Sequence, residues 1–343
     1  MEERANQDNI PPLQIGLTYN IKKNIKSEII DIEAELDSMD TVQAIKAALQ
    51  SDNCQVELME ADDSLPARLA AGPPHIVFNI AEGIQGRGRE AQVPAILNYL
   101  RIPFTGSDET TLSVALDKAL TKRLLASYHI RTPQYQIISQ AHPRMTGHIR
   151  YPAIVKPNTE GSSKGISDMA IVTNRQELYK LSGQNIAWYR QDMLVEEYIA
   201  GREFTVGILG NGNEIRVFPP MEIVYLNRKS NYNIYSYTVK QNYKQLIRYD
   251  CPANISGETE KEMVRTARRI YEILACRDFS RIDFRLTEQG VLYFIEINPL
   301  PGLAPGYSDY PMLAEFSGMD YRMLVRNICR CALKRYNLDF DFQ

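Results

Sequence analysis

The sequence contains little cysteine, little histidine and almost no excess of charge of one sign. Its 343 residues include five cysteines and four histidines, and the formal net charge is -3. The cysteines form no CxxC pair and the histidines lack metal-ligand spacing, so we expect reduced thiols and no zinc site. The small net charge argues against a dedicated nucleic-acid or membrane-surface binder, because both partners select strongly basic faces.

Long hydrophobic runs are also missing. No apolar stretch approaches the roughly 18 residues that a membrane-spanning helix needs. The first residues are polar and acidic, so no secretory signal is expected, and residues 1–12 are predicted to be a disordered lead-in. Together with the reduced cysteines, these absences predict a cytoplasmic protein.

Strands and helices alternate in the first hundred residues. Apolar runs predict strands, and apolar residues at helical spacing predict helices. The predicted strands cover residues 13–19, 55–60, 75–80 and 102–106, and the predicted helices cover residues 38–49, capped by Ser38, and 91–100. This alternation indicates a parallel sheet with helices on both faces.

The rest of the chain predicts two smaller units of mixed type. The predicted strands cover residues 151–157, 193–199, 203–209, 281–286 and 292–298, and the predicted helices cover residues 116–126, 259–275 and part of 317–336. Residues 225–250 form a long, polar, tyrosine-rich connection, and such a loop inside a compact fold is more often functional than idle. The expected fold is therefore an α/β unit followed by two α+β units.

The hairpin at 281–298 places oxygen ligands on facing strands. Arg281 and Asp283 share one face of the first strand, because strand side chains alternate between faces. Glu296 and Asn298 share one face of the second strand. Such a set suits Mg²⁺, which binds a few carboxylates together with phosphate oxygens. Taken alone, these residues also fit a solvated hairpin face. The Pro- and Gly-rich loop that follows suits a close approach of backbone to a ligand.

A lysine at the end of a strand is followed by a loop of small residues. Lys156 precedes the loop Glu160-Gly-Ser-Ser-Lys-Gly165, whose backbone N–H groups can cradle phosphate oxygens, although a plain turn is the alternative. The chain has no GxxxxGK[ST] loop, and Gly83-Ile-Gln-Gly-Arg-Gly lacks the spacing of a dinucleotide fingerprint. Glu196 and Glu203 either accept bonds from ribose hydroxyls or are surface charges.

These signals are specific as an ordered set. The chain resembles the ATP-grasp superfamily and, within it, the D-alanine–D-alanine ligase family. The matching stretches are Phe104-Thr-Gly-Ser, Leu116-Asp-Lys, Ile154-Val-Lys-Pro, Glu160-Gly-Ser-Ser-Lys-Gly, Val195-Glu-Glu-Tyr-Ile-Ala-Gly-Arg-Glu-Phe-Thr-Val, Tyr249-Asp-Cys-Pro-Ala, Arg281-Ile-Asp-Phe and Phe294-Ile-Glu-Ile-Asn-Pro-Leu-Pro-Gly. The resemblance covers the chain from about residue 75 to residue 335.

The resemblance implies three domains with the nucleotide between the last two. An N-terminal α/β domain would cover 13–112, a central subdomain 113–204 and a C-terminal subdomain 205–343, with 225–250 as a lid loop. The implied reaction is the ATP-dependent joining of a carboxylate to an amine. It would use two Mg²⁺ ions, pass through an acyl phosphate and release ADP and phosphate.

The resemblance also assigns roles to individual residues. The implied ATP contacts are Lys118, Lys156, Glu160, Gly161, Ser162, Ser163, Gly165, Glu196, Glu197, Tyr198, Ile199, Glu203 and Lys240. The implied Mg²⁺ ligands are Asp283, Glu296 and Asn298. The implied catalytic set is Arg281 and the backbone N–H of Gly302, which would stabilise the oxyanion, with Lys240 and Ser162.

The donor side of the site departs from the family pattern. The glutamate that binds the ammonium of the first D-alanine is missing after the first strand, and Glu35 or Asp37 either replaces it or is a helix cap. The family's His-Gly reads Glu82-Gly83 here. Arg87 and Arg89 are additional, and they either bind a substrate carboxylate or pair with Glu82 and Glu90 as scaffolding.

The lid and the acceptor side depart from the pattern as well. The usual Lys-Tyr pair of the lid reads Lys240-Gln241, and the serine that would hold the acceptor carboxylate appears as Ser308. We therefore expect a ligase of amino acids, small amines or peptides other than the cell-wall enzyme. The alternatives are a true D-alanine–D-alanine ligase and a nucleotide-binding protein without activity. The expected partners are small-molecule substrates, and the resemblance implies a homodimer.

Overall fold

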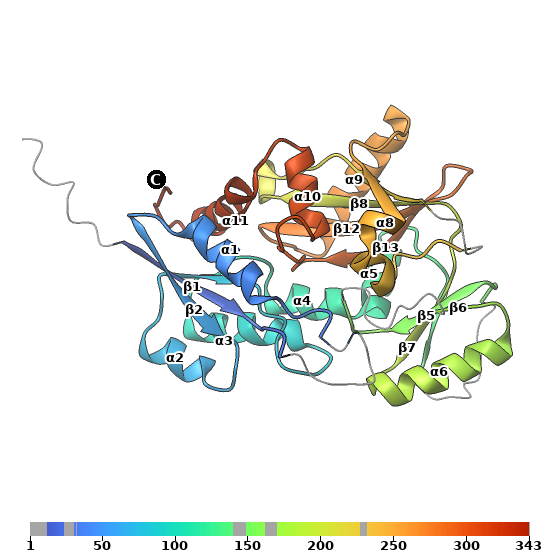
Figure 1. Cartoon of the computed structure of the whole chain (residues 1–343), viewed down its shortest axis with the longest axis horizontal. Helices are drawn as coiled ribbons and strands as arrows, with labels where there is room; N and C mark the ends of the chain where they lie inside the picture. The colour runs from blue at the N-terminus through green and yellow to red at the C-terminus, as the bar shows by residue number, and fades with distance from the viewer. Residues whose placement is uncertain are drawn as a thin grey trace, which may run out of the picture.

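The computed structural model describes residues 12–23, 31, 33–139, 149–161, 170–226 and 232–342. Within these ranges the strands form three sheets, which we call the N-terminal, central and C-terminal sheets. Figure 1 shows the N-terminal sheet (blue) and the central sheet (green) at opposite ends of the molecule, with the C-terminal sheet (yellow to red) above them.

The N-terminal sheet is parallel, as the alternation of strands and helices predicted. Its strands are β1 (Leu13–Tyr19), β2 (Cys54–Glu60) and β3 (Ile76–Asn79), in the order β2-β1-β3. Its helices are α1 (Met39–Leu49), α2 (Leu65–Ala71), η1 (Arg89–Ala91) and α3 (Gln92–Leu100). The strand predicted at 102–106 is wrong. Phe104 forms only a single bridge to Val77, because Pro103 has no N–H to donate and Gly106 turns the chain.

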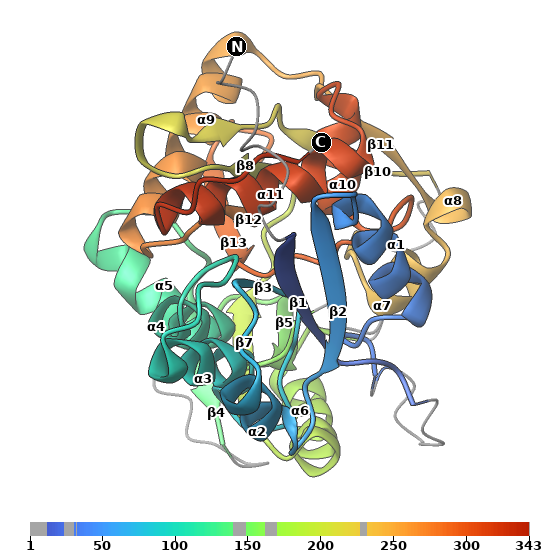
Figure 2. The ribbon, with the colours of Figure 1, turned by 90° about the vertical axis from the view of Figure 1, so that its left-hand side faces the viewer.

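Two C-terminal helices, α10 (Asp309–Phe316) and α11 (Tyr321–Arg335), complete the core of the N-terminal sheet. Helix α11 packs against α1, and Ile15 and Val42 lie in one buried cluster with Leu324 and Ile328. Figure 1 shows α11 beside α1, and Figure 2 shows the same end of the molecule face on. The C-terminal residues therefore stabilise the part of the chain that was synthesised first.

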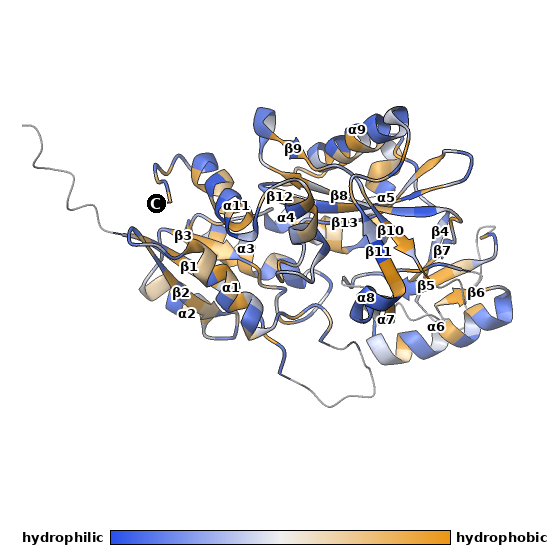
Figure 3. Cartoon of the chain, turned by 45° about the horizontal axis from the view of Figure 1, so that its top comes forward, coloured by the Kyte–Doolittle hydropathy of each residue, from blue (hydrophilic) through white to orange (hydrophobic). Residues whose placement is uncertain are grey.

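The central sheet is antiparallel, with the order β4-β7-β5-β6. It consists of β4 (Tyr135–Ile138), β5 (Ala153–Pro157), β6 (Ile171–Val172) and β7 (Met193–Glu197), and α6 (Arg175–Tyr189) packs on it. Figure 3 shows hydrophobic colour in strands such as β6 and β10 and hydrophilic colour along α6, as expected for a helix with one solvated face.

The C-terminal sheet carries the predicted acidic hairpin. Its strands are β8 (Arg202–Leu209), β9 (Arg216–Val217), β10 (Met221–Tyr225), β11 (Ile247–Asp250), β12 (Phe279–Leu286) and β13 (Leu292–Asn298). They run in the order β11-β10-β8-β12-β13, and β9 pairs with the last two residues of β8. Helix α9 (Gly257–Ile273) covers the sheet. Within the described residues, no helix has both the length and the apolar character needed to cross a membrane.

Two segments differ from their predicted form. The helix predicted at 116–126 is α5 (Lys118–Ser127), which begins after Asp117 because the Asp117 side chain accepts a bond from the Leu120 N–H. A separate helix, α4 (Glu109–Leu116), which was not predicted, precedes it. The loop predicted at 225–250 contains α7 (Tyr237–Gln241), α8 (Tyr243–Leu246) and β11. There the Ser236 hydroxyl accepts a bond from the Val239 N–H at 3.2 Å and begins α7.

Candidate active site

A cavity of about 430 Å³ lies where the N-terminal part of the chain meets the C-terminal sheet. Three segments form most of its wall: residues 34–41, residues 80–90 and residues 296–308. The residues predicted for the site that line this cavity are Glu35, Asp37, Glu82, Lys118, Glu160, Gly161, Lys240, Gln241, Arg281, Glu296, Asn298, Gly302 and Ser308. The fold thus brings together residues as far apart in the sequence as Glu35 and Ser308.

The acidic hairpin forms one side of the cavity. Asp283 on β12 is opposite Glu296 on β13, and Arg281 is opposite Asn298. The guanidinium of Arg281 donates two bonds to Asp283, at 3.1 and 2.9 Å, and Thr205 donates a third at 2.7 Å. Burial opposes the charge on Glu296, but nearby lysines and Arg281 outweigh it and lower the pKa of this carboxyl. A charged Glu296 beside an ordered Asp283 is suited to bind a cation.

Sequence reasoning missed Asp309, which holds the other side of Arg281. One oxygen of the buried Asp309 lies 3.4 Å from a guanidinium nitrogen of Arg281. The other oxygen accepts bonds from the hydroxyls of Tyr235 and Tyr249, both at 3.0 Å. Its signal in the sequence is faint: an aspartate after Ser308, and tyrosines in the predicted lid. The Arg281 guanidinium is therefore fixed between two carboxylates.

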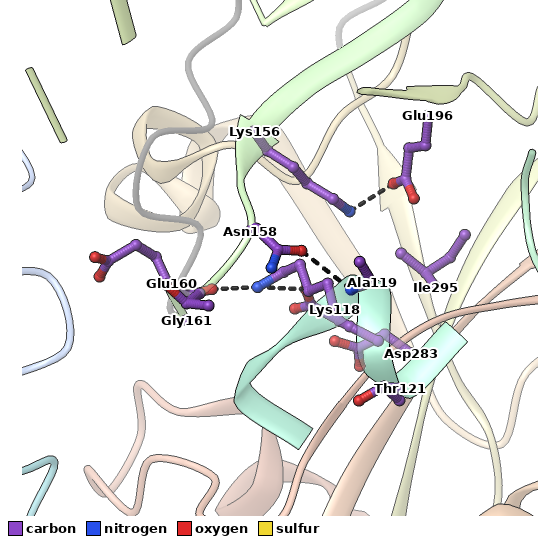
Figure 4. Close-up of polar contacts among 12 residues, drawn as sticks. Lys118, Ala119, Thr121, Lys156, Asn158, Glu160, Gly161, Glu196, Asp283 and Ile295 are labelled. Carbon is purple, nitrogen blue, oxygen red and sulfur yellow. Dashed lines mark hydrogen bonds and ion pairs between the residues drawn. The ribbon is translucent and has the colours of Figure 1, made fainter. Parts of the chain in front are cut away.

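The lysines predicted to hold phosphates come from different elements, and Figure 4 shows the Lys118 amino group directed to Glu160 and the Lys156 amino group directed to Glu196. The amino group of Lys118, at the start of α5, contacts the backbone oxygen of Glu160 and lies 3.9 Å from Glu296. Asn158 fixes the start of this helix, because its side-chain oxygen accepts a bond from the Ala119 N–H at 3.0 Å. The predicted contacts Ser162, Ser163 and Gly165 lie outside the described residues.

Glu196 is the centre of a buried ion triad, so its interpretation as a surface charge is wrong. Its carboxylate lies 2.5 Å from Lys156 and 3.0 Å from Lys122 (Figure 4 draws the first contact). Lys122 is fully buried and also donates to the Thr132 hydroxyl at 2.8 Å. Burial opposes the charge on Glu196, but Lys122 and Lys156 outweigh it and lower the pKa to about 2. Sequence reasoning missed Lys122, because a lysine within a helix normally faces solvent.

The residues after Glu196 connect the central sheet to the lid. The Tyr198 hydroxyl donates to the backbone oxygen of Asn233 at 3.1 Å and accepts from its N–H at 3.0 Å. One carboxylate oxygen of Glu203 accepts bonds from Tyr225 and from Arg285, each at 2.7 Å. The second oxygen of Glu203 has no hydrogen bond to the residues that the structure describes. The remaining predicted contacts at this edge are Glu197, which accepts a bond from the Arg150 N–H, and Ile199.

Glu35 ties the start of the phosphate loop to the N-terminal part. One of its oxygens accepts bonds from Arg89, at 2.5 Å, and from the Gly161 N–H. A Cβ atom at Gly161 would lie 3.0 Å from the same oxygen, so glycine permits this approach. Neither Glu35 nor Asp37 is a helix cap, because the Ser38 side chain caps α1.

The structure does not support the predicted role of the two arginines in binding a substrate carboxylate. Arg89 is buried and bonds to Glu35, to the Thr159 carbonyl at 2.7 Å and to Glu160 at 3.4 Å. Arg87 is exposed and pairs with Asp117 at 2.5 Å. Both line a neighbouring groove of about 1140 Å³ rather than the cavity. The two arginines do form scaffolding ion pairs, but with Glu35, Glu160 and Asp117. Among the described residues, neither arginine forms an ion pair with Glu82 or Glu90, which were the predicted partners.

The lid packs on the loop that follows the acidic hairpin. The Gln241 amide donates to the Tyr307 hydroxyl at 2.9 Å, and the Tyr243 hydroxyl donates to the Gly306 carbonyl at 2.8 Å. Gly302 lies against Ser308, because a Cβ atom there would be 2.9 Å from the serine oxygen. These contacts close the cavity on one side.

Comparisons with known proteins agree with this geometry. Residues 124–330 match the family model described as the D-ala D-ala ligase C-terminus. A D-alanine–D-alanine ligase of Aquifex aeolicus is 33% identical over 289 residues, which are 84% of this chain and 93% of that protein. The D-alanine–D-alanine ligase of Bacillus anthracis complexed with ATP has a TM-score of 0.75 at 20% identity, covering 96% of this chain and 99% of that one.

A further structural neighbour, the VanG D-Ala:D-Ser ligase of Enterococcus faecalis, has a TM-score of 0.71 at 20% identity and covers 94% of this chain and 99% of that one. The fold is therefore the ATP-grasp fold. The chain belongs to the D-alanine–D-alanine ligase family, and it is an ATP-dependent ligase that forms an amide bond.

Proposed function

We propose that this ligase joins two amino acids, or an amino acid and a small amine or peptide, through an acyl phosphate, with Mg²⁺ as the metal. The observation that carries the proposal is the shared cavity, which Lys118, Arg281 and Glu296 line together with the 298–308 loop. A carboxylate held there meets cationic groups for phosphoryl transfer and backbone donors for the acyl step. The homodimer and the cytoplasmic location expected from the sequence stay predictions.

ATP would lie between the central and C-terminal sheets. Lys118 and Lys156 are proposed to hold its phosphates, because Lys118 contacts Glu160 at the start of the phosphate loop and Lys156 lies on β5, the strand that leads into this loop (Figure 4). The backbone of residues 196–199 would line the adenine pocket. The second oxygen of Glu203 remains available for a ribose hydroxyl. Lys240 would reach the γ-phosphate, and burial lowers its pKa.

The residues of the hairpin fit Mg²⁺. Within the described residues, no group of three or more His, Cys, Asp or Glu side chains is placed to hold a metal without help. Asp283 and Glu296 supply two carboxylates, and the buried amide nitrogen of Asn298 has no hydrogen-bond partner there. Turning this amide would present its oxygen without breaking a bond. Two carboxylates and an amide oxygen, completed by phosphate oxygens, are a usual Mg²⁺ set.

The proposed reaction has two steps. A carboxylate oxygen of the first substrate attacks the γ-phosphorus of ATP, and ADP leaves. Mg²⁺, when bound, would neutralise charge on the phosphates during this transfer. The amine of the second substrate then attacks the acyl carbon, loses a proton and expels phosphate. Arg281 and the Gly302 N–H would stabilise the oxyanion, since preorganised donors act most strongly where charge develops.

The lid at 225–250 is proposed to exclude water from the acyl phosphate. The contacts of Gln241 with Tyr307 and of Tyr243 with Gly306 support this role, because they hold α7 and α8 against the loop that lines the cavity. We propose the boundaries 13–112, 113–204 and 205–343 for the three units, with the lid in the last. Water exclusion matters because hydrolysis of the intermediate would waste ATP without forming an amide.

The proposal is tested by measuring phosphate release from ATP with Mg²⁺ across paired amino acids of both hands, with mass spectrometry of the amide product. Release that requires a pair other than two D-alanines, with the matching amide, is the expected result. Release with D-alanine alone would instead establish the second candidate, a cell-wall ligase, which the named relatives favour. No release with any pair would refute the catalytic proposal.

Asp309→Asn is predicted to lower kcat by about 10- to 100-fold. Asp309 holds Arg281 from the side opposite Asp283, and its charge also acts on Lys240. Loss of its charge frees the guanidinium to shift, and small misplacements of a catalytic group are costly. Steady-state kinetics against Asp339→Asn, an exposed control, measure the effect. An unchanged kcat would show that Asp283 alone positions Arg281.

A further inference from the structure

One end of the cavity contains more carboxyl groups than an ordinary amino acid can use. Asp37, Glu82 and Glu90 line it from the segments 34–41 and 80–90, next to Glu35. Glu35 is already engaged, because it accepts bonds from Arg89 and from the Gly161 N–H. Three carboxyls thus remain at this end for a ligand.

These three carboxyls lack partners among the residues that the structure describes. The Glu90 side chain is only 8% exposed, yet it forms no hydrogen bond or ion pair with any of them. The side chains of Glu82 and Asp37, which are only partly buried, also form no hydrogen bond or ion pair with the described residues. A buried polar group without a partner is costly, so native sites keep one mainly where a ligand completes it. The unpartnered Glu90 is an observation independent of the number of acids around it.

Electrostatics support the same conclusion. Burial raises the pKa of Asp37 to about 7, and burial also raises the pKa of Glu90 to about 7. Burial and then the charges of Glu90 and Glu35 raise the pKa of Glu82 well above its usual range. The cations that face the cluster are Lys22 near Asp37, Lys118 near Glu90, and Arg89, which Glu35 and Glu160 already hold. The empty cluster is thus short of positive charge.

A structural metal is a poor explanation for the cluster. Within the described residues, no three carboxyls are close enough together to chelate one ion. Carboxyls that are spread along a wall suit an elongated ligand with separated positive groups. One ammonium needs one carboxylate, so the remaining acids can bind a second cationic group.

We propose that the amino acid bound at this end of the cavity carries two positive charges, as an α-amino acid with a basic side chain does. The inference rests on the proposed ligase function and specifies one of its two substrates. Glu90, with Glu82 and Asp37, would receive the two cationic groups. The carboxylate of the bound amino acid would then lie towards Lys118 and Arg281, which line the same cavity.

The matched probes are lysine and norleucine, which share a carbon chain and differ by the terminal amino group. Phosphate release is measured with each as one member of the amino-acid pair, in both hands, together with calorimetric binding to the enzyme. Lysine is expected to give a kcat/KM at least about 10-fold above that of norleucine, the effect of one charged hydrogen bond. Equal or better use of norleucine would overturn the inference.

Substitutions locate the effect. Glu90→Gln and Glu82→Gln keep the shape of the side chain and remove its charge. The substitution at the carboxyl that receives the side-chain ammonium is expected to remove the preference for lysine, whereas loss of the carboxyl that receives the α-ammonium would weaken both amino acids alike. Glu57→Gln, on the exposed side of β2, is the control and should keep the preference. A preference for lysine that survives both changes would place its side chain elsewhere and refute the assignment.

The outcomes separate this inference from the function on which it rests. Amide formation with neutral amino acids only would refute the basic substrate and leave the ligase intact. An absence of phosphate release with every pair would refute the ligase, and the inference with it. If a glutamine variant fails to fold, the comparison of lysine with norleucine on the unmodified enzyme still decides the question.

Discussion

Glu296→Gln is expected to reduce kcat by about three powers of ten while the protein remains folded. Glu296 lies opposite Asp283 in the hairpin, and its carboxylate lies 3.9 Å from the amino group of Lys118. Glutamine keeps the volume but removes the charge that would bind the metal. Metal stabilisation of a phosphoryl transfer is worth several kcal/mol, and each 1.36 kcal/mol is tenfold in rate.

The measurement is phosphate release at saturating substrates, over a range of Mg²⁺ concentrations. Glu288→Gln, an exposed residue in the turn of the same hairpin, is the matched control and should keep full activity. The Glu296→Gln enzyme should also need a higher Mg²⁺ concentration to bind ATP. A kcat within about tenfold of the unmodified enzyme would remove Glu296 from the metal site, because that loss is too small for a lost metal ligand.

The sequence predicts best those site residues that share one face of a strand, because the alternation of side chains along a strand depends only on spacing in the sequence. Arg281 on one strand, and Glu296 and Asn298 on the next, line one cavity, because side chains alternate along each strand. Asp283 does not line the cavity itself, but it accepts two bonds from Arg281. The sequence did not predict the shift in register between Asp283 and Phe284, which pairs Asp283 with Glu296 rather than with Ile295. The parallel N-terminal sheet was predictable, since its alternating strands and helices leave few other arrangements.

The residues that were missed depend on contacts between distant segments. Asp309 accepts hydrogen bonds from Tyr235 and Tyr249, which belong to the lid and precede it by more than 50 residues in the chain. These contacts form only when folding brings the lid next to Asp309. For Arg89 the sequence suggested a substrate carboxylate or the nearby Glu82 and Glu90 as partners, whereas its ionic partners are the distant Glu35 and Glu160. No periodicity encodes such pairings. They arise from how three units pack together, and only the folded chain shows them.

Lys122 gives the largest contrast between sequence and structure. A lysine within an amphipathic helix is expected to be exposed to solvent. Lys122 is instead fully buried against Glu196, Thr132 and the ring of Phe294. Burial lowers its pKa to about 8, so near neutral pH it is still mostly charged. The buried charge of Lys122 is compensated by the carboxylate of Glu196. Glu196 therefore contributes to the stability of the fold as well as to the proposed nucleotide site.

Glu196→Gln is therefore expected to destabilise the protein by about 3–5 kcal/mol, the usual cost of breaking a buried ion pair. Both Lys156 and Lys122 would lose their counter-ion. Denaturant unfolding at neutral pH measures the change. The control is Glu197→Gln, next on the same strand, whose ionic partner Arg150 is exposed and which should cost less than about 1 kcal/mol. A loss no larger than that of the control would show that the triad contributes nothing to stability.

The pH dependence of stability gives a second, independent test of the triad. The folded state lowers the pKa of Glu196 from 4.5 to about 2, so the charged form is favoured by folding. A lowered carboxyl pKa contributes stability above the unfolded value, which is lost as the pH falls from about 4.5 towards 2. The fall in pKa corresponds to about 3 kcal/mol. Stability should therefore drop in this window for the unmodified chain and drop less for Glu196→Gln, because glutamine has no proton to bind. Equal slopes in the two proteins would assign the acid sensitivity to other carboxyls and leave the buried lysines compensated by something other than Glu196.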